Sequence, residues 1–272
     1  MKHLLIILSF LLLFSSTFIS CSKSSDDGSK STDNTTTTGL FVTVGQSGTI
    51  LTSTDGTTWT SGTSGTTNYL NDVTYGNGLF MTVGNGGTIL TSSDGTSWTE
   101  RTSGKTNYLY GVTYGNGLFV TVGSSGVILT SSDGTTWDNR TSGTSVILGD
   151  VTYVNSTFVT IGSSGVILTS SDGTSWTERT FETSDSLTGV TYGNGLFMTV
   201  GTSGTILTST DGTTWTKRTS GTSKYLYGVT YGNGLFVVVG ENGTIITSPD
   251  EYFWTKRTSV TSVDLRGVTY SQ

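Results

Sequence analysis

The fold of this chain follows from one recurring stretch, which reads GLFVTVGSSGVILTSSDGTTWDNR at residues 117–140. It joins an apolar run, a Ser-Ser-Gly turn, a second apolar run and the turn sequence Ser-Asp-Gly-Thr-Thr-Trp. Variants recur along the chain, and the tryptophans keep a constant spacing of 39 residues: Trp59, Trp98, Trp137, Trp176, Trp215 and Trp254. Residues 39–272 therefore hold six repeats of 39 residues, and a period near 40 indicates a repeat architecture.

Each repeat predicts four short antiparallel strands. In the first copy, two apolar runs (residues 40–44 and 49–53) are separated by a glycine turn. An Asp-Gly turn at residues 55–56 then leads to a more polar outer strand, which begins at Trp59. Residues 73–75 form the fourth, inner strand, and a Gly-Asn-Gly turn joins it to the next apolar run.

Six such units predict an all-β protein, a six-bladed β-propeller whose blades are small sheets around a channel. An open β-solenoid is the alternative, but solenoids use shorter coils than these hairpin-connected strands need. The array starts with an apolar strand at residue 40 and ends with an inner strand at residues 267–270. We therefore expect the C-terminal strand to join the N-terminal blade, which closes the ring and removes its open edges. The propeller, residues 39–272, is expected to be monomeric.

Composition excludes several kinds of chemistry. The only histidine is His3 and the only cysteine is Cys21, so the propeller has neither an imidazole nor a thiol. This excludes Ser-His-Asp and Cys-His catalysis, zinc sites of the Cys/His type and disulfides within the propeller. The net charge is −6 and the sequence has no cluster of basic residues, so nucleic-acid binding is disfavoured.

The N-terminus has the anatomy of a secretory signal. Lys2 and His3 precede the apolar run LLIILSFLLLF, and the segment ends in Phe-Ile-Ser-Cys at residues 18–21. This ending resembles the lipobox of bacterial lipoproteins, which implies that residues 1–20 are a signal peptide and that Cys21 carries a lipid. An ordinary secretory signal with an incidental cysteine is the alternative. Residues 21–38 are polar after the cysteine, so we expect a flexible tether.

The resemblance to lipoproteins also implies a location. Ser22, rather than Asp, follows the cysteine, which in such lipoproteins favours sorting to the outer membrane. The run SKSSDD at residues 22–27 resembles the acidic tether of surface-exported lipoproteins of Bacteroidota-type bacteria. We expect a lipid-anchored protein of the cell envelope, at the outer membrane or cell surface of a Gram-negative bacterium.

The turn before each tryptophan resembles a known repeat. The segment STDGTTW at residues 53–59 and its counterparts resemble the Asp-box, or BNR repeat, of sialidases. With the runs GVTYGNGLFVTVG and GTILTS, residues 39–272 are similar to BNR-like propellers such as those of photosystem II assembly factors. Two departures are that one residue is missing between Asp and Trp and that the sixth copy, at residues 248–254, lacks the Gly. The resemblance implies structural turns on the face away from any active site, and the chain does not resemble WD40 repeats.

A sialidase-like site would need three convergent arginines, a tyrosine nucleophile with a Glu partner and an acid. The recurring arginines occupy one outer-strand position in five repeats, so we expect them to radiate around the rim: Arg101, Arg140, Arg179, Arg218 and Arg257. The box aspartates are expected to form turns: Asp55, Asp94, Asp133, Asp172, Asp211 and Asp250. No catalytic residue, metal or cofactor is assigned. Whether the protein is an enzyme stays open, although the sequence favours a protein without catalytic activity.

Differences between the repeats cluster in two loops, one before Gly48 and its equivalents and one before each inner strand. Both loops emerge on the same face of a four-stranded blade, so we expect a partner to bind there. The ligand-binding candidates are Tyr69, Asp72, Tyr108, Tyr110, Asp150, Asp185, Lys224, Tyr225, Tyr227, Asp264 and Arg266. Tyrosines among polar residues suit a protein or glycan surface.

Asp72 and Asp150 stand where other repeats have Gly, and we expect them to enter the channel. They could bind calcium there, although two carboxylates fall short of a full site.

The sequence thus predicts an envelope lipoprotein that binds a protein or carbohydrate partner through its propeller and contacts the membrane through the lipid at Cys21. One alternative is a glycoside hydrolase that uses carboxylates such as Asp72, Asp150, Asp185 or Asp264. Another is a structural or assembly-assisting propeller, as the resemblance to assembly factors implies.

Overall fold

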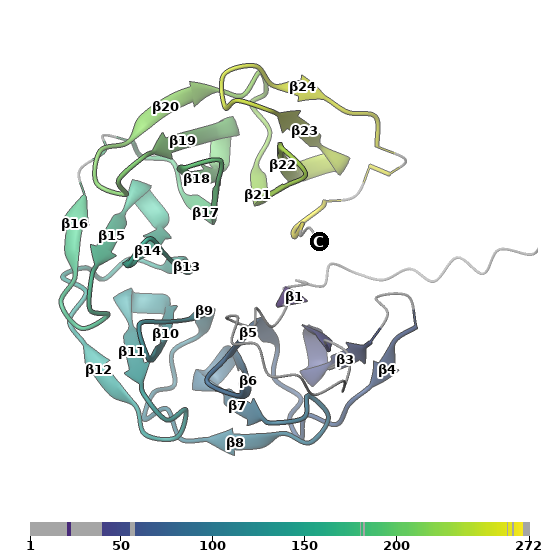
Figure 1. Cartoon of the computed structure of the whole chain (residues 1–272), viewed down its shortest axis with the longest axis vertical. Helices are drawn as coiled ribbons and strands as arrows, with labels where there is room; N and C mark the ends of the chain where they lie inside the picture. Colours follow the sequence, from purple (N-terminus) through teal and green to yellow (C-terminus); the bar gives the residue numbers. More distant parts are fainter. Residues whose placement is uncertain are drawn as a thin grey trace, which may run out of the picture.

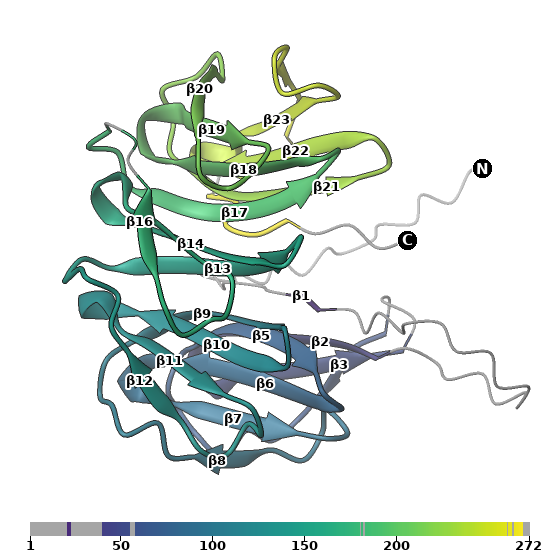
Figure 2. The same cartoon turned by 60° about the vertical axis from the view of Figure 1, so that its left-hand side comes forward.

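The computed structural model describes residues 21–22, 40–54, 58–179, 181, 183–259, 261–262 and 264–268. In these residues, six sheets of four antiparallel strands are arranged as blades around a centre (Figure 1). The view turned by 60° shows successive blades stacked side by side (Figure 2). The all-β propeller architecture that the 39-residue repeat predicts is therefore confirmed.

We number the blades in chain order and name their strands from the inner to the outer strand. Blade 1 contains β1 (Cys21–Ser22), β2 (Phe41–Val44), β3 (Ile50–Ser53) and β4 (Thr60–Ser61). Blade 2 contains β5 (Leu70–Gly76), β6 (Leu79–Gly84), β7 (Ile89–Ser92) and β8 (Thr99–Arg101). Blade 3 contains β9 (Leu109–Gly115), β10 (Leu118–Gly123), β11 (Ile128–Ser131) and β12 (Asp138–Arg140).

The remaining three blades repeat this order. Blade 4 contains β13 (Leu148–Val154), β14 (Thr157–Gly162), β15 (Ile167–Ser170) and β16 (Thr177–Arg179). Blade 5 contains β17 (Leu187–Gly193), β18 (Leu196–Gly201), β19 (Thr205–Ser209) and β20 (Thr216–Thr219). Blade 6 contains β21 (Leu226–Gly232), β22 (Leu235–Gly240), β23 (Ile245–Ser248) and β24 (Thr255–Lys256).

A three-residue 3-10 turn joins the second and third strands of each blade. These turns are η1 (Gln46–Gly48), η2 (Asn85–Gly87), η3 (Ser124–Gly126), η4 (Ser163–Gly165), η5 (Thr202–Gly204) and η6 (Glu241–Gly243). Across the described ranges, no helix has the length and apolar character needed to cross a membrane.

The hydrophobic core lies between the blades. In the blades that have a neighbour on each side, both faces of the second and third strands are covered, which explains why these strands are apolar at successive positions. Between blades 2 and 3, for example, Met81 and Ile89 pack in one cluster with Phe119 and Leu129, and all four side chains are at most 1% exposed. Burying a side chain of this size contributes roughly 1.5–3 kcal/mol. Equivalent clusters join blades 1 and 2, 3 and 4, 4 and 5, and 5 and 6.

A close approach between inner strands fixes how neighbouring blades meet. The Tyr114 ring of β9 packs on Phe119 of its own blade, with 4.7 Å between ring centroids. It also lies against Gly76 of β5, where a Cβ atom would come within 2.1 Å of the Tyr114 Cγ atom. Only glycine fits at this position, so the glycine that ends the inner strand has a packing role.

The turn before each tryptophan is held by its aspartate, as the sequence predicts. In blade 2, Asp94 Oδ1 accepts the backbone N–H groups of Thr96 and Ser97, each at 2.8 Å. The Ser92 hydroxyl donates to the same carboxylate at 2.9 Å. These hydrogen bonds lower the pKa of Asp94 from its usual value. The same arrangement recurs at Asp133, Asp172, Asp211 and Asp250, whereas residues 55–57 lie outside the described residues.

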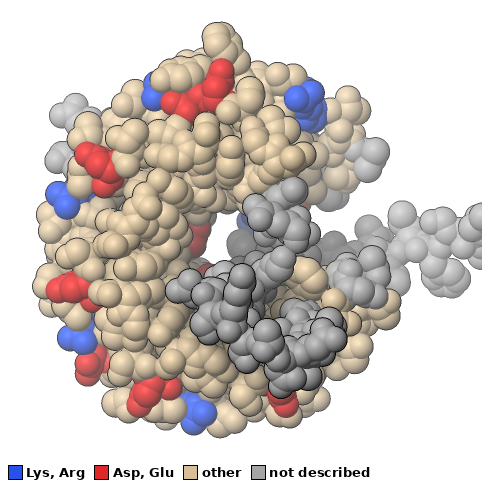
Figure 3. Space-filling view, viewed as in Figure 1, with Lys and Arg blue, Asp and Glu red and all other residues tan. Residues whose placement is uncertain are grey.

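The recurring arginines do not converge. Arg101 Nε donates to the Thr91 hydroxyl of the neighbouring strand at 2.8 Å, and the equivalent bond recurs in blades 3, 4, 5 and 6. Most of the Lys and Arg atoms visible in the space-filling view lie apart from one another around the outer rim (Figure 3). Each of these arginines thus bonds within its own blade, as expected for side chains that radiate around the rim.

The inner position of blade 1 differs from the expectation. β1 pairs with β2 there, with Cys21 opposite Thr43 and Ser22 opposite Val42. The sequence predicts a flexible tether at these two residues instead. Without a partner, β2 would present unpaired backbone N–H and C=O groups, and an edge of this kind pairs readily with an extended segment.

The expected closure by residues 267–270 is not seen in the described residues. Residues 269–272 lie outside them, and residues 264–268 belong to none of the six sheets. The number of blades and the strand order thus follow the prediction, whereas closure of the ring by the C-terminal strand stays a prediction.

Candidate ligand-binding site

The two loops that vary most between repeats lie together on one face. In blade 3, the Ser124 N–H donates to the Tyr108 carbonyl at 2.8 Å, and the Gly126 N–H donates to the Val146 carbonyl at 2.7 Å. We use the name variable-loop face for η1–η6 together with the residues just before each inner strand (66–69, 105–108, 144–147, 183–186, 222–225, 261–262 and 264). Antiparallel strands reverse at every turn, so the aspartate-containing turns lie on the opposite face, which we call the box face.

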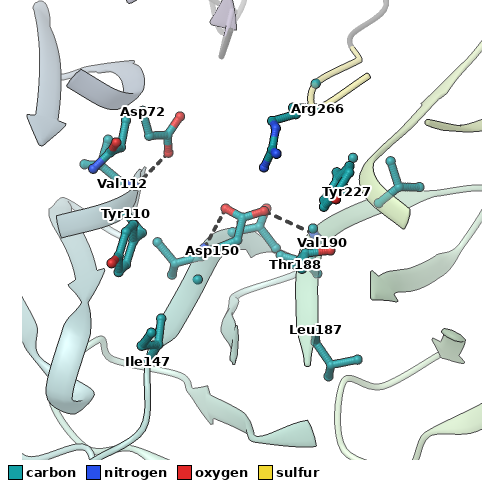
Figure 4. Close-up of a pocket in the computed structure, with 18 of the residues that line it drawn as sticks. Asp72, Tyr110, Val112, Ile147, Asp150, Leu187, Thr188, Val190, Tyr227 and Arg266 are labelled. Carbon is teal, nitrogen blue, oxygen red and sulfur yellow. Dashed lines mark hydrogen bonds between the residues drawn. The ribbon is translucent and has the colours of Figure 1, made fainter. Parts of the chain in front are cut away.

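A cavity of about 640 Å³ lies at the centre of the propeller. Its wall is made largely by the first residues of β5, β9, β13, β17 and β21 and by residues 266–268, so it lies at the variable-loop end of the channel. Five of the predicted ligand-binding residues line it: Asp72, Tyr110, Asp150, Tyr227 and Arg266 (Figure 4). The space-filling view shows acidic atoms at the edge of this central hollow (Figure 3).

Each channel aspartate connects two blades. Asp72 accepts the N–H of Val73 in its own strand and the N–H of Val112 in blade 3, both at 2.8 Å. Asp150 accepts the N–H of Val151 at 2.8 Å and that of Val190 in blade 5 at 3.1 Å. The prediction that both aspartates enter the channel is confirmed. All four carboxylate oxygens therefore already accept a backbone hydrogen bond.

The two carboxylates influence each other. Burial, and next the charge of Asp72, raise the pKa of Asp150 to about 7, although its two backbone hydrogen bonds act in the opposite direction. Asp150 consequently binds and releases its proton near neutral pH. Burial also raises the pKa of Tyr110, which keeps this phenol protonated. The acidic wall of the cavity therefore changes its charge within the physiological pH range.

The opposite wall carries a cation. The Arg266 guanidinium carbon lies 4.6 Å from the centroid of the Tyr227 ring, a cation–π arrangement. Arg266 Nη2 also lies 3.3 Å from Asp264 Oδ2, to which the Tyr227 hydroxyl donates at 3.4 Å. Figure 4 shows Arg266 pointing into the cavity on the side opposite Tyr110. The cavity therefore combines two carboxylates, one guanidinium group and two phenol rings.

The other predicted residues lie outside the cavity. Tyr69, Tyr108 and Tyr225 stand on the variable-loop face with 43%, 48% and 48% of their surface exposed. Asp185 accepts the Thr205 hydroxyl at 2.6 Å and lies 3.6 Å from Lys217 Nζ, and these contacts lower its pKa. Lys224 Nζ lies 3.8 Å from Glu241 Oε1. Asp185 and Lys224 are thus held by local partners, whereas the three tyrosines present free ring surface.

Among the lining residues that were not predicted, two connect neighbouring blades through their side chains. Asn71 Nδ2 donates to the Leu109 carbonyl at 2.8 Å, and the Thr188 hydroxyl donates to the Leu226 carbonyl at 2.6 Å. Both line the cavity, and both reach the first residue of the next inner strand. The sequence contains a signal that could have identified both residues. They occupy the second position of an inner strand, and this position varies more between the repeats than the other positions of that strand.

The residues that the structure describes contain no group of three or more His, Cys, Asp or Glu side chains that could hold a metal ion. A cation between Asp72 and Asp150 would have to share carboxylate oxygens with four backbone N–H groups. The calcium hypothesis therefore remains without a full set of ligands.

Fold and cavity together define a β-propeller with a polar cavity at one end of its channel. A family model described as "DUF6242 beta propeller domain" matches residues 144–265. No curated protein matches the chain.

Solved structures resemble the whole propeller. YCF48 from Cyanidioschyzon merolae superposes with a TM-score of 0.68 at 18% identity, covering 92% of this chain and 89% of that one. A structure described as "YCF48 bound to D1 peptide" gives a TM-score of 0.64 at 18% identity, with 80% and 76% covered. The WD40 propeller domain of Doa1 gives 0.65 at 15% identity, with 91% and 87% covered. At these identities the likeness shows the fold alone.

Proposed function

We propose that the chain is a binding propeller, closed as a six-bladed ring, that holds a segment of a partner protein at its variable-loop face. The central cavity carries this proposal, because its volume of about 640 Å³ falls within the range of roughly 300–1,000 Å³ common for ligand pockets. Its wall offers charges of both signs and two phenol rings from several blades. A peptide carries charged and aromatic groups of the kinds that these side chains can pair with.

The tyrosines around the cavity support the same proposal. Tyr108 and Tyr225 are each 48% exposed, and a tyrosine side chain supplies a large contact area while losing few rotamers. The Tyr108 and Tyr110 rings lie edge to face, with 6.4 Å between ring centroids. The exposed ring of Tyr108 and the cavity-lining ring of Tyr110 therefore form one continuous aromatic surface. A solved propeller of similar fold is described as bound to a peptide, which favours a protein segment over a glycan.

Binding of the purified protein to a peptide array and to a glycan array tests the proposal. Tyr108→Ala and Tyr225→Ala should each weaken binding about tenfold or more, because an exposed tyrosine at the centre of an interface contributes on the order of 1–2 kcal/mol. Tyr252→Ala is the matched control, since Tyr252 is 57% exposed in the turn between β23 and β24, on the box face. Equal losses for all three variants would contradict the proposal. Binding to glycans alone would replace the protein partner with a carbohydrate.

A glycoside hydrolase is the second candidate. The observation in its favour is the pKa of Asp150, which burial raises to about 7 beside the carboxylate of Asp72, since glycosidases pair a protonated acid with an ionised carboxylate. Against it, both carboxylates are occupied by backbone N–H groups. Turnover of a fluorogenic glycoside that is lost in Asp150→Asn would establish this candidate and overturn the binding proposal.

We further propose that the protein is a lipoprotein of the bacterial envelope, anchored through Cys21, at the outer membrane or cell surface. The Phe-Ile-Ser-Cys ending of the leader supports this. Cells fed radioactive palmitate should label the wild-type protein, and Cys21→Ala should remove both the label and the membrane association. Labelling that persists in Cys21→Ala would contradict the anchor without affecting the binding proposal.

A further inference from the structure

The wall of the central cavity differs at blade 4 from the other blades. In blades 2, 3, 5 and 6, the second position of the inner strand carries a side chain that lines the cavity: Asn71, Tyr110, Thr188 and Tyr227. In blade 4 this position is Gly149, which also lines the cavity. The wall therefore has no side chain at the residue that immediately precedes Asp150.

The backbone does not require glycine at residue 149. A Cβ atom there would lie 3.6 Å from the Leu187 carbonyl oxygen and 3.9 Å from the Ile161 carbonyl oxygen, which are ordinary van der Waals distances. Gly149 also does not belong to the glycines with a positive φ. The missing side chain thus leaves space in the cavity and does not relieve a clash.

The missing side chain also leaves a hydrogen-bond acceptor in the wall. In blades 2 and 5, the second residue of the inner strand donates to the carbonyl of the first residue of the next one, as the Thr188 hydroxyl does to Leu226 at 2.6 Å. For blade 4 the corresponding carbonyl is that of Leu187, which lines the cavity. Gly149 has no side chain to reach it. A carbonyl oxygen has two lone pairs, so this one can accept a hydrogen bond from a ligand.

An apolar side chain lies on the variable-loop side of the same space. Ile147, in the loop just before β13, lines the cavity and is 43% exposed. In the view of Figure 4, Asp150 lies between Ile147 and Arg266. We call the part of the cavity bounded by Ile147, Gly149, Asp150 and Leu187 the blade-4 recess. A group that enters it from the variable-loop face meets an apolar surface first and a carboxylate next.

The electrostatics of the recess favour a cation. The neighbouring charge that acts on Asp150 is that of Asp72, also a carboxylate, and with burial it raises the pKa of Asp150 to about 7. Arg266, on the opposite wall, lies 3.3 Å from Asp264 Oδ2 and over the Tyr227 ring. A cation placed at Asp150 is therefore attracted by two carboxylates, whereas an anion there is repelled.

Other groups around Asp150 do not titrate near neutral pH. β10, β14 and η3 pack on β13 and contain no titratable side chain. β9 contributes Tyr110 and β21 contributes Tyr227, and burial raises the pKa of both phenols, which keeps them neutral. The one titratable side chain of β17, Tyr192, packs on Phe197 near the other end of that strand. Among the residues that line the cavity, Asp150 is thus the group whose charge changes near pH 7.

We infer that the blade-4 recess receives a lysine or arginine side chain of the partner segment, with its aliphatic part on Ile147 and its charged end at the Asp150 carboxylate and the Leu187 carbonyl. Each oxygen of Asp150 has another lone pair besides the one that accepts a backbone N–H. A single ammonium or guanidinium group needs far fewer oxygen atoms than a calcium ion. This inference rests on the proposed function, because it names the chemistry of the segment that binds.

Binding of a basic side chain should depend on pH. A bound cation favours the ionised carboxylate, so Asp150 releases its proton to the solvent when the side chain enters. Because the pKa of Asp150 without ligand is about 7, about one tenth of these carboxylates are ionised at pH 6 and about nine tenths at pH 8. The affinity for a basic side chain should therefore rise about tenfold from pH 6 to pH 8. The affinity for an uncharged side chain should not.

Pools of octapeptides test the inference on the immobilised purified protein. Their fourth residue is fixed as Lys, Arg, norleucine or Glu, the other positions hold uncharged residues, and both ends are blocked. Norleucine has an aliphatic chain like that of lysine but no charge. Below saturation, retention of the Lys and Arg pools should rise about tenfold from pH 6 to pH 8, whereas retention of the norleucine and Glu pools should not rise.

Three variants locate the effect. Gly149→Thr gives blade 4 the residue that blade 5 has at this position. It should keep the melting temperature, since a Cβ atom fits there, but should fill the recess and remove the pH-dependent retention. Asp150→Asn should remove it as well. Asp138→Asn is the matched control, because it also removes one negative charge, from an outer-strand side chain that is 69% exposed, and it should behave as the wild type.

Equal retention of the Lys and Arg pools at pH 6 and pH 8 would overturn the inference, and so would stronger retention of the Glu pool. A loss in Asp138→Asn as large as in Asp150→Asn would also overturn it, because the basic pools would then be attracted by the net negative charge of the protein. If no pool is retained while the peptide array binds, the inference alone fails. If the array does not bind either, the proposed function fails with it.

Discussion

At the scale of single residues, the third position of the inner strand sets the chemistry of the channel. Blades 3, 5 and 6 have glycine there, whereas blades 2 and 4 have Asp72 and Asp150. The sequence predicted that both side chains enter the channel. It did not predict that each carboxylate accepts a backbone N–H from the following blade, because that contact depends on how neighbouring blades are placed in space.

Asp150 makes the stability of the protein depend on pH. Its pKa, raised to about 7 by burial and by Asp72, exceeds the ordinary value of 3.8, so the folded state keeps a proton that the unfolded state has lost. Stability should therefore fall as the pH rises from about 4 to 7, by on the order of 4 kcal/mol at most, and then level off. Melting curves measured between pH 5 and 8 report this change.

The matched variant for this prediction is Asp150→Asn. Its side chain cannot ionise, so its melting temperature should change less with pH than that of the wild type. The aspartates of the box turns do not contribute to the pH dependence of stability between pH 5 and 8. Their pKa values are lowered, so their contribution is complete above about pH 4 and is lost only as the pH falls further. No histidine lies in the propeller. A wild-type melting temperature that rises steadily from pH 5 to 8 would contradict the assignment.

At the scale of elements, the 3-10 turn between the second and third strands connects one blade to the loop before the next. Gly126 of η3 has φ +68° and donates its N–H to the Val146 carbonyl. A Cβ atom there would lie 2.0 Å from the Thr144 carbonyl oxygen. Gly117, in the hairpin between β9 and β10, has a similar φ of +76°, but a Cβ atom would meet nothing within 4 Å.

These two glycines give a matched pair of variants. Gly117→Ala should destabilise the protein by roughly 1–2 kcal/mol, the cost of the left-handed backbone alone. Gly126→Ala should add a steric cost of roughly 1–3 kcal/mol and should also weaken partner binding, because the turn belongs to the variable-loop face. Chemical denaturation of both variants measures the difference. Equal losses of stability would show that the turn is not packed as described.

The strands themselves were largely predictable from the repeat. The pattern of two apolar runs, one polar run and the sequence Val-Thr-Tyr gave four strands per blade in the observed order. The inner strand is longer than expected, since β5 begins at Leu70, and its register shifts between Leu70 and Asp72. This irregularity arises where the strand leaves the variable loop, and no turn residue marks it in the sequence. The family resemblance to BNR propellers stays a prediction.

At the scale of the whole molecule, one question of connectivity remained beyond the sequence. The phase of the repeats predicted a closing strand at the C-terminus, yet Cys21 and Ser22 pair with the same edge. The sequence pattern could not reveal this competition, because two polar residues without periodicity carry no strand signal. An open sheet edge supplies the missing explanation, since it accepts any extended segment that reaches it.

Removal of either end of the chain should therefore have unequal effects. Deleting residues 267–272 should lower the melting temperature sharply and cause concentration-dependent aggregation, because the sequence assigns the closing strand to this segment and an open ring exposes strand edges. Deleting residues 21–39 should leave the melting temperature and the monomer nearly unchanged. Differential scanning calorimetry with light scattering distinguishes the two truncations. The reverse order of stabilities would show that β1, rather than the C-terminal strand, completes blade 1.

The central claim is that a partner binds the variable-loop face and not the box face. The most direct measurement is site-specific photo-crosslinking in living cells, with the same photoreactive amino acid placed in turn at Tyr108, Tyr225 and Tyr252. All three tyrosines are 48–57% exposed, so the probes differ in the face they report rather than in accessibility. We predict one common cross-linked product from positions 108 and 225, which disappears in an Asp72→Asn and Asp150→Asn background, and no such product from position 252. A product from position 252 alone, or equal products from all three positions, would contradict the account.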